Sequence, residues 1–359
     1  MDNLLREYAG THYDYDERGN QIRRWHNGQQ SRLHWDLFDR LVRFEDNRLR
    51  VDYAYDPLGR RLYKYSNAHH PHRNEAGSQW NQNEQARKQR ELGCGFTLFG
   101  WDGDTLAWES SPAQADGASG KTVHYLYEPG TFVPVAQALR HQPMRLLAQP
   151  SYTGAYDIDQ DPLWTHTPQA LPIDVLAWYQ CDHLGTPQEL TDPTGQIAWS
   201  AQYKAWGEVK EQRSDWARQK GLTNPIRFQG QYHDHETGLH YNRYRYYDPR
   251  AGRFISKDPI SYAGGLNLYA YAPNPVEWVD PLGLARSGRW ERVGNGRVRI
   301  DPPHVENTNQ QMHAHCQCNL RREEVVINKD GSQSHGSRGS VSELTRKEKE
   351  YLRNKGFEL

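Results

Sequence analysis

Residues 53–62 read YAYDPLGRRL, and this stretch decides how most of the chain should fold. Its alternating tyrosines suit one face of a strand, its Asp-Pro pair opens a turn, and its glycine supplies a positive φ before Arg-Leu re-enters the sheet. Residues 13–20, YDYDERGN, repeat the pattern, and looser copies begin at Trp35 and Gly100. Repetition of one strand–turn–strand unit predicts a long ribbon of β-hairpins.

The composition supports a mainly β chain whose net charge is close to zero. Only 36% of the 359 residues are hydrophobic, whereas Trp and Tyr number 12 and 22, and the mean hydropathy is −1.00. We therefore expect aromatic rather than aliphatic side chains to supply most of the burial. The net charge of −1 means that any nucleic-acid surface must be local.

Two polar stretches interrupt the repeats, residues 66–93 and 141–172, and we expect both to be surface excursions. The first is expected to contain a short helix near residues 83–91. Turn residues recur between them and beyond, notably over residues 182–208, at the roughly eight- to twelve-residue spacing typical of all-β domains.

Several classes of protein are excluded by what the sequence lacks. No run approaches the roughly 20 apolar residues that cross a bilayer, so we expect no membrane segment. The first ten residues, MDNLLREYAG, have no basic region followed by an apolar one, which argues against a classical signal peptide. Four scattered cysteines are too few for a disulfide framework.

Residues 224–284 carry a dense set of short motifs. They are RFQGQY at 227–232, ETGLHYN at 236–242, YDP at 247–249, GRF at 252–254, DP at 258–259 and DPLGL at 280–284. With the repeats before them, these motifs resemble the C-terminal core of Rhs (rearrangement hotspot) or YD-repeat proteins, and the resemblance covers roughly residues 1–284. It implies a β-hairpin ribbon that forms part of a cocoon around a toxic C-terminal domain.

The resemblance divides the chain into three expected parts. Residues 1–175 would form the YD-repeat scaffold with its two polar insertions, residues 176–284 the Rhs-associated core, and residues 285–359 a variable toxin-like domain. The overall expectation is a mainly β chain followed by a small α+β domain.

The resemblance also implies that the chain cuts itself between Leu284 and Ala285. Aspartyl proteolysis requires two carboxyl groups that share a proton, one to activate water and one to protonate the substrate. Asp258 and Asp280 lie in Asp-Pro steps at matching positions, and Arg253 is the expected charge partner.

Two alternatives remain open for these carboxyl groups. Asp248 is also available as the partner of Asp280. An Asp-Pro step commonly does no more than open a turn, so either aspartate can have a purely structural role.

The tail, residues 285–359, contains 14 Lys and Arg against 10 Asp and Glu, an excess that suits an anionic substrate. The sequence GNG at residues 294–296 predicts a hairpin. In the following strand, Arg297, Arg299 and Asp301 share one face, opposite the valine and isoleucine between them.

Residues 312–320, MHAHCQCNL, bring two histidines and two cysteines together in one short segment of the tail. With a period of two, both cysteines fall on the apolar face and His313 and His315 fall on the polar face. A zinc site of His and Cys is disfavoured because one strand directs them to opposite sides. We expect no metal and no cofactor here. Together with His304 or His335 and the arginines, the histidine pair suits a metal-independent ribonuclease. The alternative is that these are ordinary exposed histidines on a polar face.

The end of the tail predicts a helix. Ser340 and Glu343 form a capping-box pattern, so a helix is expected from near Val341 to Gly356. The resulting small α+β domain is similar to the compact ribonuclease toxins of contact-dependent and type VI systems.

These observations favour a polymorphic toxin of interbacterial competition with a self-cleaving scaffold and a C-terminal nuclease. The family implies a cognate immunity protein and delivery by a secretion system. The toxin would be made in the producer's cytoplasm, exported without a signal peptide, and act on nucleic acid, more readily RNA, in the target-cell cytoplasm. The alternatives are a non-enzymatic YD-repeat structural or adhesion protein with a binding tail, and a metal-dependent DNase toxin.

Overall fold

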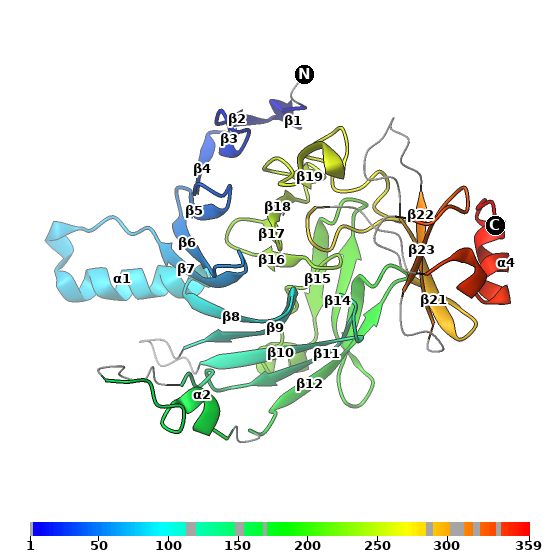
Figure 1. Ribbon diagram of the computed structural model, residues 1–359. Helices are drawn as coiled ribbons and strands as arrows, with labels where there is room; N and C mark the ends of the chain where they lie inside the picture. The colour runs from blue at the N-terminus through cyan, green and yellow to red at the C-terminus, as the bar shows by residue number, and fades with distance from the viewer. Residues whose placement is uncertain are drawn as a thin grey trace.

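The computed structural model of the protein describes residues 3–112, 120–147, 154–167, 171–284, 290–301, 312–318, 324–334 and 339–359. Within these residues the strands form three antiparallel sheets of fifteen, four and four strands. The large sheet curves around the second sheet, and the third lies at the C-terminal end of the molecule (Figure 1). The expected mainly β fold is confirmed.

The first sheet is a continuous meander in which each strand pairs with the next one in the chain. Its strands are β1 (Glu7–Tyr8), β2 (Thr11–Tyr15), β3 (Gln21–His26), β4 (Gln29–Trp35), β5 (Leu41–Glu45), β6 (Leu49–Tyr55), β7 (Arg61–Ala68), β8 (Phe96–Asp102), β9 (Thr105–Ser111), β10 (Lys121–Tyr127), β11 (Pro134–Arg140), β12 (Val175–Cys181), β13 (Pro187–Thr191), β14 (Ile197–Tyr203) and β15 (Val209–Arg213). Because β11 pairs with β12, the sheet crosses the expected boundary at residue 175 without a break and ends at Arg213.

One turn geometry recurs along this sheet and explains the repeat. Between β6 and β7, the Asp56 carboxylate accepts the N–H of Arg60 at 2.8 Å, and Gly59 adopts φ 77°, which a residue with a side chain rarely does. The carboxylates of Asp16, Asp36, Asp182 and Asp192 accept the N–H four residues later in the same way. The copy expected at Gly100 differs, since β8 and β9 are joined by a two-residue turn.

The polar insertions carry short helices. The 3-10 helix η1 (Asn74–Ala76) precedes α1 (Ser78–Glu91), which begins five residues earlier than the sequence pattern predicted. The amide of Asn81 fixes this earlier start, because it bonds the backbone carbonyls of Arg73 and Gly77. In the described part of the second insertion lies α2 (Pro162–Thr165).

The second sheet lies inside the curve of the first and completes its core (Figure 1). After α3 (Asp215–Gln219) it comprises β16 (Tyr232–Asp234), β17 (Leu239–Asn242), β18 (Arg245–Asp248) and β19 (Arg253–Phe254), followed by the 3-10 helix η2 (Ser261–Gly264). Tyr241 and Tyr246 from this sheet pack in the same cluster as Leu41, Val51 and Trp199 from the first. The expectation of a mainly aromatic core is therefore wrong, because inward positions along the ribbon hold aliphatic side chains as well.

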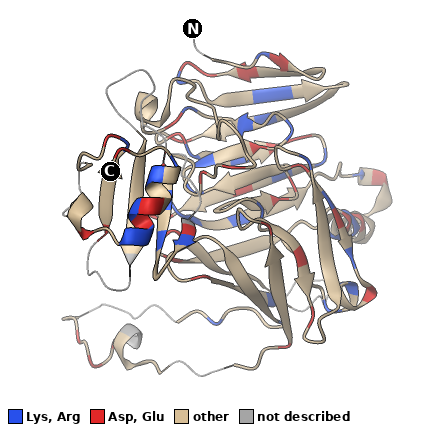
Figure 2. Cartoon of the chain, turned by 90° about the vertical axis from the view of Figure 1, so that its right-hand side faces the viewer, with Lys and Arg blue, Asp and Glu red and all other residues tan. Residues whose placement is uncertain are grey.

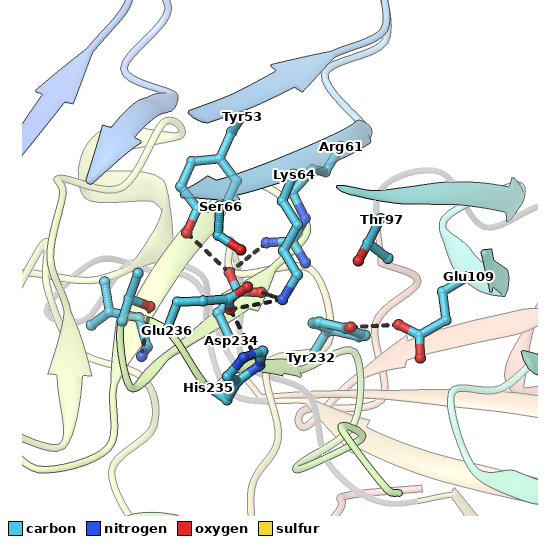
Figure 3. Close-up of polar contacts among 12 residues, drawn as sticks. Tyr53, Arg61, Lys64, Ser66, Thr97, Glu109, Tyr232, Asp234, His235 and Glu236 are labelled. Atoms are coloured by element: carbon cyan, nitrogen blue, oxygen red, sulfur yellow. Dashed lines mark hydrogen bonds and ion pairs between the residues drawn. The ribbon is translucent and has the colours of Figure 1, made fainter. Parts of the chain in front are cut away.

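A buried charged cluster joins the two sheets (Figure 3). From the first sheet, Arg61 and Lys64 contact Asp234 at 2.6 Å and 3.2 Å, and Lys64 also contacts Glu236 at 2.8 Å. Tyr232 donates a hydrogen bond to Glu109 on β9. The four charged groups from Arg61, Lys64, Asp234 and Glu236 have opposite partners, as burial requires, so the cluster fixes the position of β16 against β7.

The tail forms the third sheet and a helix with a core of their own. Its elements are β20 (Trp290–Val293), β21 (Gly296–Asp301), β22 (His313–Cys318), β23 (Val325–Asn328), the 3-10 helix η3 (Val341–Glu343) and α4 (Arg346–Asn354). Figure 2 shows that basic and acidic residues follow one another along the ribbon of α4. The hairpin expected at residues 294–296 is present.

The C-terminal helix starts later than expected. The predicted Ser340 capping box forms, but it caps only η3, because Leu344 is extended with ψ 136°. A second capping box, formed by Thr345 and Glu348, starts α4. The single helix expected from Val341 is therefore two elements.

Candidate functional site

Asp258 and Asp280 share one buried arginine, Arg245 of β18. Its Nη2 lies 2.9 Å from Oδ2 of Asp258 and 3.4 Å from Oδ2 of Asp280. All three side chains are almost completely buried. The Arg245 guanidinium also lies 3.7 Å from the ring centre of Phe254, which fixes its plane.

The same group of side chains holds the end of the DPLGL motif. Oδ1 of Asp280 accepts the N–H of Leu284 at 2.9 Å, and Nε of Arg245 donates to the carbonyl of Gly283. Gly264 of η2 lies between Asp258 and the Leu284 carbonyl. A Cβ on Gly264 would stand 2.3 Å from Oδ2 of Asp258 and 2.8 Å from that carbonyl oxygen. The carboxyl group of Asp258 and the carbonyl oxygen of Leu284 therefore both lie close to the Cα of Gly264.

The electrostatics distinguish Asp258 as a proton carrier. Burial raises the pKa of Asp258 to about 6, against the lowering effect of Arg245, and the charge of Asp280 adds to the increase. Burial disfavours the charged form of the carboxyl group, and Asp280 adds to this because two buried carboxyl groups share one guanidinium. Asp258 holds a proton at pH values where an ordinary aspartate has lost it.

Two of the residues considered from the sequence lie elsewhere. Arg253, the expected charge partner, donates to the carbonyl of Asn3 and stacks 4.7 Å from the ring centre of Tyr269. Asp248, the alternative acid, lies 3.7 Å from Arg24. Sequence reasoning missed Arg245. No sequence signal singles it out, because all four residues of β18 are buried and only the folded chain brings Arg245 to both acids.

The tail gathers a second set of polar side chains on one face of its sheet. Asp301 of β21 pairs with His313 of β22, and Arg299 pairs with His315. Oδ2 of Asp301 lies 3.2 Å from Nε2 of His315 and 2.7 Å from Nη2 of Arg299. One ligand atom from each of Asp301, His313 and His315 lies within 4.8 Å of the others, so these three could hold a metal ion.

His315 lies between two carboxylates. Its Nδ1 is 3.3 Å from Oε1 of Glu324, an ion-pair distance with a poor hydrogen-bond angle. Burial lowers the pKa of His315, but the contacts with Asp301 and Glu324 outweigh it, so the pKa is raised above its ordinary value. The arrangement favours a charged imidazole.

The structure describes only some of the other tail residues that were predicted from the sequence. His304 and His335 lie outside the described residues. Arg297 donates to Gln317 at 2.9 Å, further along the sheet from the histidine pair. Cys316 is fully buried in the tail core, as its place on the apolar face predicted.

The chain is similar in sequence and in fold to known proteins. The family model described as "RHS protein" matches residues 176–213. The chain is 36% identical over 320 residues to "Double-stranded DNA deaminase toxin A" of Burkholderia cenocepacia, a match that covers 86% of this chain and 19% of the relative. It is 37% identical over 292 residues to "Toxin protein Tse5" of Pseudomonas aeruginosa, covering 79% and 19%.

The chain is an Rhs-family protein. It spans about a fifth of the length of these two Rhs relatives, and the printed names of both describe toxins. A solved structure, "Crystal Structure of TcdB2-TccC3", has the same fold over 75% of this chain and 11% of its own, with a TM-score of 0.50 and 22% identity. In the described part of this Rhs chain, none of the helices is long and apolar enough to span a membrane.

Proposed function

We propose that this Rhs chain belongs to a toxin used in competition between bacteria, that it cleaves itself after Leu284, and that its tail is a nuclease. The observation that carries the proposal is the sharing of Arg245 by Asp258 and Asp280 next to Leu284. Relatives that are named as toxins support the biological setting.

The self-cleavage step follows from the two carboxyl groups. The Asp280 carboxylate takes a proton from water, which attacks the carbonyl carbon of Leu284, and the Asp258 carboxylic acid protonates the carbonyl oxygen. When the resulting tetrahedral intermediate collapses, Asp280 gives its proton to the amide nitrogen of Ala285, Asp258 takes its proton back from the hydroxyl oxygen, and the C–N bond breaks. Arg245 holds both acids in place through its contacts with their Oδ2 atoms.

Expression of the full chain tests this step. Mass spectrometry of the purified product should give two fragments with a cut after Leu284, whereas Asp258→Asn should give one uncut chain. Asp248→Asn is the matched control, because Asp248 lies in the same core but pairs with Arg24. It should cut normally. An uncut wild-type chain that is folded by circular dichroism would refute the proposal.

For the tail we propose a metal-independent ribonuclease. His313 and His315 lie side by side with ring centres 5.2 Å apart, and Arg299 contacts the same carboxylate as His315. One imidazole would take the proton of the ribose 2′-hydroxyl, the other would protonate the leaving oxygen, and Arg299 would stabilise the charged phosphorane. The release of the tail by self-cleavage would free it to reach RNA in the cytoplasm of the target cell.

Induced expression of the full chain in bacteria tests the nuclease. Growth arrest with degraded RNA and intact DNA is expected, and His313→Ala should restore growth. His12→Ala, which removes a histidine far away in the first sheet, should remain toxic. Degraded DNA with intact RNA would instead favour a DNase, and normal growth with both nucleic acids intact would favour a binding tail.

The proposal implies two kinds of partner. A delivery system would carry the toxin out of the producing cell, and an immunity protein would protect that cell by covering the histidine face of the tail. Co-expression with the product of the neighbouring gene should abolish growth arrest if that gene encodes the immunity protein.

A further inference from the structure

We propose that Asp301, His313 and His315 bind Zn²⁺ or a similar late transition-metal ion, and that the bound ion switches the nuclease off. The first half of this inference stands on the geometry of the three side chains alone. The second half rests on the nuclease proposed above.

The three side chains are close to the positions that a metal site requires. They come from paired positions on β21 and β22 and point from the same face of the sheet. Two ligands bound to one zinc ion at about 2.1 Å lie roughly 3.4 Å apart, and Oδ2 of Asp301 is already 3.2 Å from Nε2 of His315. Since all three ligand atoms lie within 4.8 Å, only small side-chain rotations are needed.

A supporting carboxylate is also present. In metal sites a ligating histidine usually presents its second ring nitrogen to a carboxylate or carbonyl, which fixes the ring and strengthens the ligand. Glu324 lies 3.3 Å from Nδ1 of His315, on the side away from Asp301. Burial of Asp301 and His313 adds a rigid, largely dry setting.

The ligand set selects among metals. Two imidazoles and one carboxylate suit Zn²⁺, Co²⁺ or Ni²⁺, whereas Mg²⁺ prefers oxygen ligands and keeps most of its water. Arg299 weakens the site, because it contacts Asp301 at 2.7 Å and repels a cation. It does not occupy the site, since a carboxylate offers about four lone pairs.

Metal binding and acid–base catalysis exclude each other here. An imidazole nitrogen that gives its lone pair to a metal ion cannot accept a proton, so a bound ion removes His313 and His315 from catalysis. A ribonuclease built on this pair is therefore silent when zinc occupies the site and active after zinc is removed.

Metal binding is tested directly, without reference to activity. The full chain carrying Asp258→Asn, which should remain a single species, is stripped with chelator and titrated with Co²⁺. We expect a visible absorption band that saturates at one ion per chain and is lost when Zn²⁺ is added, and no binding of Mg²⁺ by calorimetry. His313→Gln and His315→Gln should abolish the band, and His12→Ala should keep it.

Two further variants separate a metal site from a merely folded tail. Glu324→Gln should weaken zinc binding by about 10- to 100-fold, as the loss of a supporting carboxylate does. Arg299→Gln should tighten it, because a competing positive charge is gone. Circular dichroism of each variant checks folding. No cobalt band in the folded parent chain would overturn the site and leave the nuclease proposal standing.

The switch is tested with RNA as substrate. RNA cleavage by the wild-type chain, which releases its tail, should stop when zinc saturates the site and should return when chelator is added. Stimulation by zinc would overturn the switch and the metal-free mechanism together. Zinc binding without any nuclease activity would support the site, overturn the switch and count against the proposed nuclease.

Discussion

Both candidate sites contain an arginine beside carboxylates, but the two sites are built differently. In the Rhs core, Arg245 of β18 meets Asp258 and Asp280, which lie in loops beyond the second sheet. In the tail, Arg299 and Asp301 are two residues apart on one strand, and the histidines lie on the next strand. The first site depends on how loops fold onto a sheet, and the second depends on strand alternation.

The largest expected difference between the two sites is in stability. Arg245→Met removes the positive charge that two buried carboxyl groups share and should lower the free energy of unfolding by about 3–5 kcal/mol. Arg299 is partly exposed, so Arg299→Met should cost about 1 kcal/mol. Urea denaturation of both variants measures the difference. Equal losses would mean that burial does not distinguish the two sites.

Strand alternation in the tail is tested by a neighbouring pair of residues. Cys316→Ser places a hydroxyl in the fully buried face of β22 and should cost about 1–3 kcal/mol. Gln317→Ser lies on the other face and should cost less than about 1 kcal/mol. The thermal midpoints of the two variants give the comparison. A larger loss for Gln317→Ser than for Cys316→Ser would contradict the assignment of Cys316 to the buried face of β22.

The acid of the core site should show in the pH dependence of self-cleavage. Because the pKa of Asp258 is raised to about 6, its proton is present below that pH and lost above it. The rate of cleavage after refolding from denaturant should therefore fall about tenfold per pH unit above 6. A rate that is constant from pH 6 to 8 would exclude Asp258 as the proton donor. The folded state also holds this proton more tightly than the unfolded state. Protonated Asp258 therefore adds to the free energy of unfolding at low pH, and this contribution is lost as pH rises from about 4 to 6.

The smallest effect concerns the start of α4. Thr345→Ala removes the side chain that caps this helix and should cost about 1 kcal/mol. Ser340→Ala affects only η3 and should cost less. Circular dichroism at increasing temperature measures both, and a larger loss for Ser340→Ala would restore the single helix that the sequence suggested.

Local chemistry explains why so much of the fold was predictable. The turn in which an aspartate accepts an N–H four residues later needs only Asp, Gly and flanking strands, all visible in one short segment. The start of α1 was missed because it depends on Asn81, whose amide bonds reach back to Arg73 and Gly77. The packing of the second sheet inside the first was not predicted from periodicity; it depends on long-range pairs such as Lys64 and Glu236.

The same contrast applies to the sites. Alternation placed His313, His315, Arg299 and Asp301 on polar faces, but only the register of β21 against β22 brings Asp301 opposite His313. In the core, the family resemblance supplied Asp258 and Asp280. Several arginines lie nearby in the sequence, and only the folded chain shows that Arg245, on a strand buried at every position, reaches both acids.

A substitution at Gly264 offers a way to keep the tail attached to its scaffold without replacing either acid. A methyl group at this position would overlap both Oδ2 of Asp258 and the Leu284 carbonyl. Gly264→Ala should therefore push the Asp258 carboxyl group away from the carbonyl oxygen that it is proposed to protonate. Its backbone is not in the left-handed region, so the alanine itself introduces no strain there. A chain blocked in this way would keep its full set of ionisable groups, which makes it suitable for trapping the uncut precursor with its charges unaltered.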